Sequence, residues 1–271
     1  MTFDEKEAVL FVGVEMDIKE SILTEEAEYP KNFASYKKFE FGIAFYFEKS
    51  KELHEGNHAI LFPEKIKNLE SALNEITKFY INKDIEPAIF HPFTPCYFEK
   101  NREVIERCGY SLTIYENYRF MILSEKNTIS TPRRMEIKRV TDWDERISND
   151  IIIPCGEVWE IESTKANLSN PDNFLFVGYL DGQAVTYTTF HRSVKNNCTR
   201  FDYILTAKKY RGHGYARELL DFVVNFCNKN QFQNCFQWAG IPTSERITYE
   251  AGFRVAFEAE SGHANYIRKF H

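Results

Sequence analysis

The segment from Tyr210 to Ala216 lies between an apolar run typical of a strand and an amphipathic helix pattern. Gly212 and Gly214 allow the backbone to come close to a ligand, because glycine has no Cβ atom. The helix that follows presents unpaired N–H groups and a partial positive charge at its N-terminus, which suits a phosphate group. Arg211 adds a full positive charge beside them. The segment therefore predicts a binding site for a phosphorylated cofactor.

Other phosphate-binding turns fit this segment less well. A dinucleotide-binding turn has a third glycine three positions after the second, where this chain carries Arg217. A Walker loop needs Gly-Lys followed by Ser or Thr, and the segment lacks these residues. The open alternative is an ordinary surface turn at the start of a helix.

Arg211, Gly214 and Ala216 match the pattern Arg/Gln-x-x-Gly-x-Gly/Ala. The segment thereby resembles the acyl-CoA signature of the GCN5-related N-acetyltransferase (GNAT) family. The flanking elements follow the family's order over residues 135–270 and end in a last strand at residues 264–268. The resemblance implies an α/β (α+β) fold with a mixed, mainly antiparallel central sheet flanked by helices.

The resemblance also implies that acetyl-CoA binds along this loop and the strand before it. In the family the loop amides hold the pyrophosphate, and the edge of the strand binds the pantetheine arm where that strand parts from its neighbour. A backbone N–H near Leu205 or Thr206 would then polarise the thioester carbonyl. The family's asparagine before the next helix is missing, so Thr243 or Ser244 supplies that contact, unless Thr243 only caps the helix. The expected cofactor-binding residues are Leu205, Thr206, Arg211, Gly212, His213, Gly214, Tyr215, Ala216 and Thr243.

Transfer of an acetyl group to an amine requires a group that accepts the ammonium proton. Asp202 lies nine positions before Arg211, where some members of the family place such a base. The alternative is a strand-end carboxylate in an ordinary hydrogen bond. By the same resemblance, Glu157, Glu160 and Glu162 lie on the acceptor side, where they either orient the amine or form a solvated helix face.

The general acid departs from the family pattern. Members of the family commonly carry a tyrosine four positions before the glycine that ends the last helix, with its hydroxyl near the sulfur. Here Tyr249 lies three positions before Gly252. Either Tyr249 still faces the sulfur, or Thr248 occupies that position and Tyr249 turns about 100° away around the helix. We expect Tyr249 and Asp202 to be the catalytic residues.

Residues 1–124 repeat the order of elements in the second half without a strict sequence repeat. A helix is expected at residues 64–82, followed by a strand, a helix and two strands. The turn before that helix carries Phe62 and Pro63 in place of glycine and arginine, so we expect no coenzyme A there. The predicted division, typical of a tandem member with one silent half, is a degenerate GNAT-like domain (1–124), a linker (125–134) and a catalytic GNAT domain (135–271).

Composition argues against several other classes of protein. The net charge of −6 argues against nucleic acid as the main partner. No apolar run approaches the ~20 residues of a membrane span, and the N-terminus lacks a signal-peptide pattern. The six cysteines form no Cys-x-x-Cys pair and no cluster with zinc-ligand spacing. These observations predict a cytoplasmic, metal-free protein that does not act at a membrane.

The sequence therefore predicts an N-acetyltransferase that moves an acetyl group from acetyl-CoA directly to a primary amine of a small molecule. Two alternatives stay open, a non-catalytic acyl-CoA sensor and transfer to a peptide or protein N-terminus. The sequence determines neither the acceptor nor whether the protein is a monomer or a homodimer.

Overall fold

The computed structural model describes residues 17–91, 95–124, 133–238 and 242–267. Eleven strands form one sheet in the order β1-β2-β3-β4-β11-β5-β10-β9-β8-β7-β6. Of the pairs in this sheet, β3–β4 and β9–β10 are parallel and the others are antiparallel. The mixed, mainly antiparallel sheet predicted from the resemblance is confirmed. The strands are β1 (Ser35–Phe39), β2 (Gly42–Tyr46), β3 (Ala59–Leu61), β4 (Ala88–His91), β5 (Tyr110–Leu123), β6 (Glu136–Val140), β7 (Asn173–Leu180), β8 (Gln183–Ser193), β9 (Cys198–Thr206), β10 (Cys235–Trp238) and β11 (Phe253–Tyr266).

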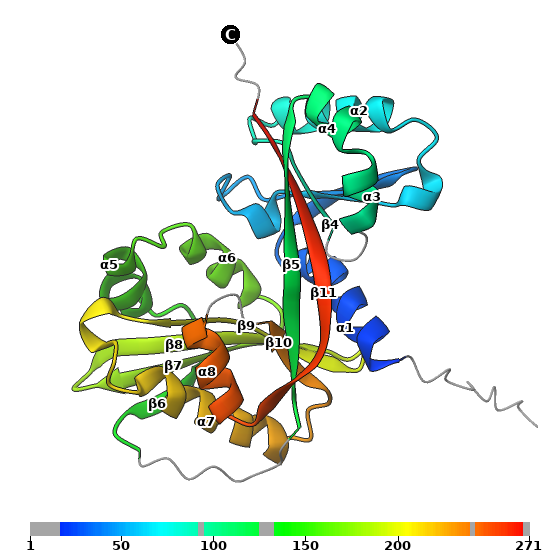
Figure 1. The fold of residues 1–271 in the computed structure, drawn as a ribbon. Coiled ribbons are helices and arrows are strands. Elements are labelled where there is room, and N and C mark those ends of the chain that lie inside the picture. The colour runs from blue at the N-terminus through cyan, green and yellow to red at the C-terminus, as the bar shows by residue number, and fades with distance from the viewer. Residues whose placement is uncertain (1–16, 92–94, 125–132, 239–241, 268–271) are drawn as a thin grey trace, which may run out of the picture.

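Helices lie around both halves of this sheet. In Figure 1, α2, α3 and α4 gather beside the first strands, and α5 to α8 surround the strands of the second half. The helices are α1 (Ile18–Glu28), α2 (Leu69–Ile81), α3 (Pro95–Lys100), α4 (Arg102–Arg107), α5 (Ile153–Cys155), α6 (Glu160–Asn167), α7 (Tyr215–Lys229) and α8 (Pro242–Glu250), with short 3-10 turns at η1 (Tyr29–Asn32), η2 (His54–Gly56), η3 (Pro63–Lys65) and η5 (Lys208–Tyr210) and a π-helical turn at η4 (Ile147–Ile152).

Helix α2 begins later than its apolar periodicity predicts. The expected helix started at residue 64, but Pro63–Lys65 form the separate turn η3 and α2 starts at Leu69. The Asn68 side chain accepts a hydrogen bond of 2.9 Å from the Ser71 backbone N–H, which is the geometry of a helix N-cap. The predicted start of this helix at residue 64 was therefore wrong, because the capping residue Asn68 decides where the helix begins.

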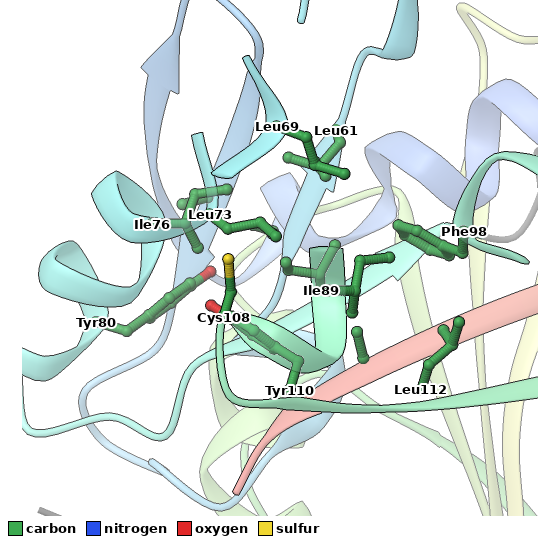
Figure 2. Packing of buried hydrophobic residues seen from close by; sticks show 14 of the residues in the cluster. Leu61, Leu69, Leu73, Ile76, Tyr80, Ile89, Phe98, Cys108, Tyr110 and Leu112 are labelled. Carbon is green, nitrogen blue, oxygen red and sulfur yellow. The ribbon is translucent and has the colours of Figure 1, made fainter. Parts of the chain in front are cut away.

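Each half of the sheet has its own apolar core. In the first half, Leu73, Ile76 and Tyr80 of α2 pack with Ile89 of β4 and Tyr110 of β5, as Figure 2 shows. In the second half, α7 packs on the sheet through a cluster that includes Phe190, Phe201, Leu219, Leu220, Val223, Val224 and Phe253.

Strands β5 and β11 connect the two halves. They pair with each other from Phe253 opposite Leu123 to Tyr266 opposite Tyr110, and Figure 1 shows both running from one half to the other. The later part of β11 also pairs with β4, and the end of β5 pairs with β10. The last strand, expected only at residues 264–268, is therefore a long strand whose end completes the sheet of the first half.

This pairing bears on the predicted domain boundaries. The sheet is continuous across the two halves, so strand pairing does not by itself separate residues 1–124 from residues 135–271. Most of the predicted linker, residues 125–132, lies outside the described residues. The division into domains stays a prediction.

The two halves share one structural unit. Strands β3 and β4 are parallel and are connected through α2, and β9 and β10 are parallel and are connected through α7. A parallel pair needs a crossover connection of this kind. The repeated unit supports the duplication expected from the order of elements.

Candidate active site

The glycine-rich loop lies at the N-terminus of α7, as the sequence predicts. Gly212 and Gly214 both have a φ of 80°, a left-handed conformation that glycine adopts without strain. Residues 211–214 are exposed, and Gly214 is the N-cap of α7. The first N–H groups of a helix have no partner inside it. The loop therefore offers hydrogen-bond donors at the positive end of a long helix.

Arg134 contacts the glycine-rich loop, although the sequence did not lead us to expect it there. Its Nη1 donates to the His213 carbonyl at 2.8 Å, and its Nε donates to Glu218 Oε2 at 3.1 Å. The buried Glu218 carboxylate also accepts hydrogen bonds from the backbone N–H groups of Arg134 and Met135. The guanidinium lies 4.7 Å from the centre of the Tyr215 ring. The Arg133-Arg134 pair before β6 is its signal in the sequence, and the predicted division places this pair in the linker.

Arg211 turns back along the end of β9. Its Nε donates to the Thr206 carbonyl at 3.1 Å, and its Nη2 lies 3.5 Å from the Cys155 sulfur. Leu205 is buried, and its carbonyl accepts a hydrogen bond from the Thr186 hydroxyl. Arg211 and Arg134 thus place two positive charges next to the loop.

Strands β9 and β10 part where the resemblance predicts that they do. Their parallel pairing comprises Cys235 opposite Thr199 and Phe236 opposite Arg200. Beyond this point β9 is paired with β8, and Trp238 of β10 is paired with β5. Leu205 and Thr206 therefore lie past the last residues of β9 that pair with β10. The expected separation of these two strands is confirmed.

Asp202 is held in a network of hydrogen bonds. It is the extra residue of a β-bulge in β9, because Tyr203 lies opposite Thr189 and Phe201 opposite Phe190. One carboxylate oxygen accepts hydrogen bonds from the Tyr29 hydroxyl at 2.9 Å and from the Thr189 hydroxyl at 3.3 Å, and the other accepts one from Arg200. These contacts favour the second alternative, a carboxylate with structural hydrogen bonds. The role of Asp202 as a base stays a prediction.

Arg200 joins both halves of the chain. Its side chain is 2% exposed, and its guanidinium donates to Glu26 of α1, Glu55 of η2 and Asp202. The distances to Glu26 and Glu55 are both 2.7 Å. Burial, together with the charge of Asp202, raises the pKa of Glu55 to about 8 against the opposing effect of Arg200. Burial also raises the pKa of Glu26. One arginine is thus surrounded by three carboxylates.

Of the three glutamates expected on the acceptor side, one is buried. Glu160, at the start of α6, accepts a hydrogen bond of 3.2 Å from the Thr164 hydroxyl. Burial, with the charges of Asp202 and Glu55, raises the pKa of Glu160 well above its usual value. Glu157 instead accepts a hydrogen bond from the Trp159 indole N–H, and Glu162 lies 3.9 Å from Lys165.

Tyr249 turns away from the interior, and Thr248 takes the inward position. The Tyr249 side chain is 54% exposed, and the Arg254 guanidinium lies 3.9 Å from the centre of its ring. Thr248 is 1% exposed and accepts a hydrogen bond from Gln237 of β10. This geometry favours the alternative in which Thr248 replaces the family's tyrosine. The general-acid role of Tyr249 stays a prediction without support from the geometry.

Thr243 lies inside α8, which begins at Pro242. It is therefore not the residue before the helix that the N-cap alternative requires. The Thr243 side chain lies outside the described residues, and its contact with pantetheine stays a prediction. Within the described ranges, no group of three or more His, Cys, Asp or Glu side chains is arranged to hold a metal ion. In the same part of the chain, no helix is both long and apolar enough to cross a bilayer.

Comparison with known proteins gives a match to one family model and several similar solved structures. Residues 139–247 match the model of the acetyltransferase (GNAT) family. A solved GCN5-related N-acetyltransferase from Kribbella flavida is similar, with a TM-score of 0.64 and 13% identity over 92% of this chain and 95% of its own. One from Sphaerobacter thermophilus has a TM-score of 0.53 and 11% identity over 92% of each chain.

A tandem GNAT protein from the clavulanic acid biosynthesis pathway is also similar. Its TM-score is 0.50 with 10% identity, over 79% of this chain and 76% of the other. None of the curated proteins matches the chain. At these identities the structural similarity shows the fold, and it extends over both halves of the chain.

Proposed function

We propose, from the match of residues 139–247 to the acetyltransferase (GNAT) family, that the chain transfers an acetyl group from acetyl-CoA to a primary amine of a small molecule. The observation that carries the proposal is the adjacency of two features. The glycine-rich loop leads into α7. The strand before the loop, β9, extends beyond the residues that pair with β10. A pyrophosphate on the loop would direct the pantetheine arm along this strand.

The residues present suit coenzyme A. The loop from Arg211 to Ala216 offers backbone donors, and Arg211 and Arg134 offer positive charge to the pyrophosphate. The backbone at Leu205 and Thr206 would bind the pantetheine arm, and Thr243 would add a contact from α8. Coenzyme A supplies the thioester as co-substrate, and we propose no metal.

The chemistry is a direct transfer. The amine nitrogen bonds to the acetyl carbon, the carbon–sulfur bond breaks, and the proton lost by the nitrogen ends on the coenzyme A thiol. A backbone N–H near Leu205 would stabilise the negative charge that develops on the carbonyl oxygen. Asp202 and Glu160 are the two carboxylates proposed to take this proton from the nitrogen and to pass it on to the sulfur. Glu160 is favoured by its contacts, because Thr164 is the only hydrogen-bond donor described on its carboxylate, whereas Asp202 has three.

Binding of acetyl-CoA is the first test, measured by calorimetry on the wild type and on Gly214→Trp. We expect one equivalent per chain, lost in the variant because an indole would fill the loop. Gly182→Trp is the matched control, since Gly182 also has a φ of 80° but lies in the β7–β8 hairpin turn. Two equivalents would mean that the first half also binds coenzyme A. Equal binding by all three proteins would contradict the proposed loop site.

A second candidate is a non-catalytic acyl-CoA sensor. The outward position of Tyr249 and the three donors on Asp202 favour it, because both weaken the expected catalytic pair. The two candidates differ in turnover. Release of free coenzyme A with a panel of amines, above the rate without amine, would reject the sensor. Binding without such release would support it. Peptides with free N-termini belong in the same panel, because transfer to a peptide N-terminus is the other open alternative.

The cytoplasmic location of the protein stays a prediction.

A further inference from the structure

A buried acid lies in the first turn of the helix that follows the glycine-rich loop. Glu218 belongs to α7, which begins at Tyr215, and its side chain is 1% exposed. A carboxylate is favourable at the N-terminus of a helix when no other anion is bound there. Beside a bound pyrophosphate it adds a repulsive negative charge. An uncompensated carboxylate at this position would therefore oppose binding of the cofactor.

The Glu218 carboxylate binds the two residues just before β6. Its Oε1 accepts hydrogen bonds from the backbone N–H groups of Arg134 at 2.7 Å and Met135 at 2.9 Å. Its Oε2 accepts one from Arg134 Nε at 3.1 Å. Among the described residues no hydrogen bond joins this carboxylate to an N–H group of the loop. The carboxylate thus leaves the loop donors free, and one guanidinium compensates its charge.

The same contact fixes the direction of the Arg134 guanidinium. While Nε is bound to Glu218, Nη1 donates to the His213 carbonyl at 2.8 Å, and the guanidinium lies 4.7 Å from the centre of the Tyr215 ring. The position that a Cβ atom on Gly214 would take lies 3.5 Å from Nη2. Within the described part of the chain no hydrogen-bond partner is recorded for Nη2, and 47% of the side chain is exposed. One donor group of the guanidinium therefore stays available at the loop.

Arg211, the other cation beside the loop, is held elsewhere. Its described hydrogen bonds run to the Thr206 carbonyl and to the Cys155 sulfur, at the end of β9. Arg134 is thus the arginine whose contacts hold it against the glycines. A donor that is fixed before the ligand arrives loses less conformational entropy on binding.

Building on the proposed function, we infer that Glu218 is a positioning residue for the cofactor. It holds the Arg134 guanidinium at the glycine-rich loop, where the Nη2 donor binds the pyrophosphate of coenzyme A. The same ion pair neutralises the negative charge of Glu218. The residue before β6 and the first turn of α7 thus form one part of the cofactor site.

Glu218→Gln separates positioning from simple electrostatics. The glutamine carbonyl can still accept from the two backbone N–H groups, but its NH₂ group would meet Arg134 Nε, and both are donors. The guanidinium then loses its anchor, and calorimetry should show a Kd for acetyl-CoA that is about tenfold higher. Removal of a negative charge alone would instead strengthen binding of the anionic cofactor. An equal or lower Kd in the variant would overturn the inference.

Asp221→Asn is the matched control. Asp221 is also a buried acid of α7, and it pairs with Arg217 at 2.6 Å. The described hydrogen bonds of the Arg217 side chain run to Asp221 and Glu250, away from the loop. The Kd of this variant should differ from that of the wild type by less than about twofold. An equal rise of the Kd in both variants would show a general disturbance of α7 and would contradict the role of Glu218.

Arg134→Lys keeps the charge but not the geometry of the guanidinium. An ammonium group is a point charge that cannot reproduce the fixed set of donors on Glu218, His213 and the ligand. The Kd should therefore approach that of Arg134→Ala. Wild-type affinity in Arg134→Lys would contradict the inference, and this test does not depend on the folding of Glu218→Gln.

The double variant of Glu218→Gln and Arg134→Ala tests whether the two residues act together. Both changes remove the same contact, so the double variant should bind acetyl-CoA no more weakly than Arg134→Ala alone. Losses that multiply would show that Glu218 acts on binding independently of Arg134, which would contradict the inference.

Failure of the proposed function gives a different result. If acetyl-CoA binds but no amine is acetylated, the transferase proposal fails, and the Kd values of the variants still test the inference. If the wild type binds no acetyl-CoA, inorganic pyrophosphate becomes the probe. Pyrophosphate binding that is weakened in Glu218→Gln would support the positioning role, and no binding of pyrophosphate by the wild type would reject it.

Discussion

The two parallel β-α-β units of this chain differ at the turn where the strand enters the helix. After β3 the turn carries Phe62 and Pro63, and Pro63 starts the 3-10 turn η3. After β9 the turn carries Gly212 and Gly214, both at a φ of 80°. Proline has no N–H to donate, whereas the glycines let the backbone approach a phosphate. The same frame therefore suits a phosphate group only at the turn that carries the glycines.

The first half contributes in another way. Glu26, Tyr29 and Glu55 reach across to Arg200 and Asp202 of β9. The half without a glycine turn thus supplies two of the three carboxyl groups that contact Arg200. The two units therefore share an architecture, but only the second carries the glycine turn, and the first supplies carboxylates to Arg200.

The largest expected effect comes from breaking the junction between the halves. Arg200→Met should lower the free energy of unfolding by about 3–5 kcal/mol, because it leaves buried carboxylates without their cation. The measurement is urea unfolding followed by circular dichroism. Arg192→Met, at an exposed arginine on the neighbouring strand β8, should cost less than about 1 kcal/mol. Similar losses in both variants would mean that the Arg200 network does not stabilise the junction.

This junction also marks the limit of what the sequence predicts. The glycine loop, its helix and the parting of β9 from β10 follow from local pattern and family resemblance. The Arg200 network joins residues up to 174 positions apart, and no periodicity reports such a contact. The bulge at Asp202 further breaks the strict alternation of side chains along β9, so the direction of its carboxylate could not be read from the sequence.

Local register explains the other differences. A change of one position around a helix turns a side chain by about 100°, and this decides between Thr248 and Tyr249. The start of α2 depended on the Asn68 cap, and the end of β11 on pairing with β4. In each case a contact with another residue outweighed the apolar pattern.

The second prediction tests whether Arg134 contributes to cofactor binding at the glycine turn. Arg134→Ala should weaken acetyl-CoA binding by about tenfold, because one charged contact near the loop is lost. Calorimetry measures the Kd. The control is Arg133→Ala, since Arg133 stacks at 5.0 Å on Phe222 of α7 and has no described contact with the loop. An unchanged Kd in a stably folded Arg134→Ala protein would remove Arg134 from the cofactor site.

The third prediction is that titration of Glu55, in the first half, makes the free energy of unfolding depend on pH. The pKa of Glu55 is raised to about 8, chiefly by burial, so the folded protein holds a proton that the unfolded chain releases near pH 4.5. The stabilisation is complete below pH 4.5 and is lost as the pH rises toward 8. Because Glu55 is partly exposed, we expect a loss of only about 1 kcal/mol over this range.

Glu55→Gln provides the comparison for this pH effect, because glutamine keeps a polar group without the titration. Unfolding by urea at several pH values between 4.5 and 8 should show a smaller fall in stability for the variant than for the wild type. Parallel curves for both proteins would show that Glu55 does not hold its proton in the folded state.

The smallest effect is expected at Tyr249. Its ring stacks on Arg254 at the surface, and its hydroxyl would have to reach the sulfur from the outer face of α8. Tyr249→Phe should therefore change kcat with the best amine by less than about twofold, about 0.4 kcal/mol in the barrier. Thr248→Val, which removes the buried hydroxyl that Gln237 contacts, should lower kcat more. A loss of tenfold or more in Tyr249→Phe, with KM unchanged, would restore the tyrosine as general acid and would require α8 to turn when coenzyme A binds.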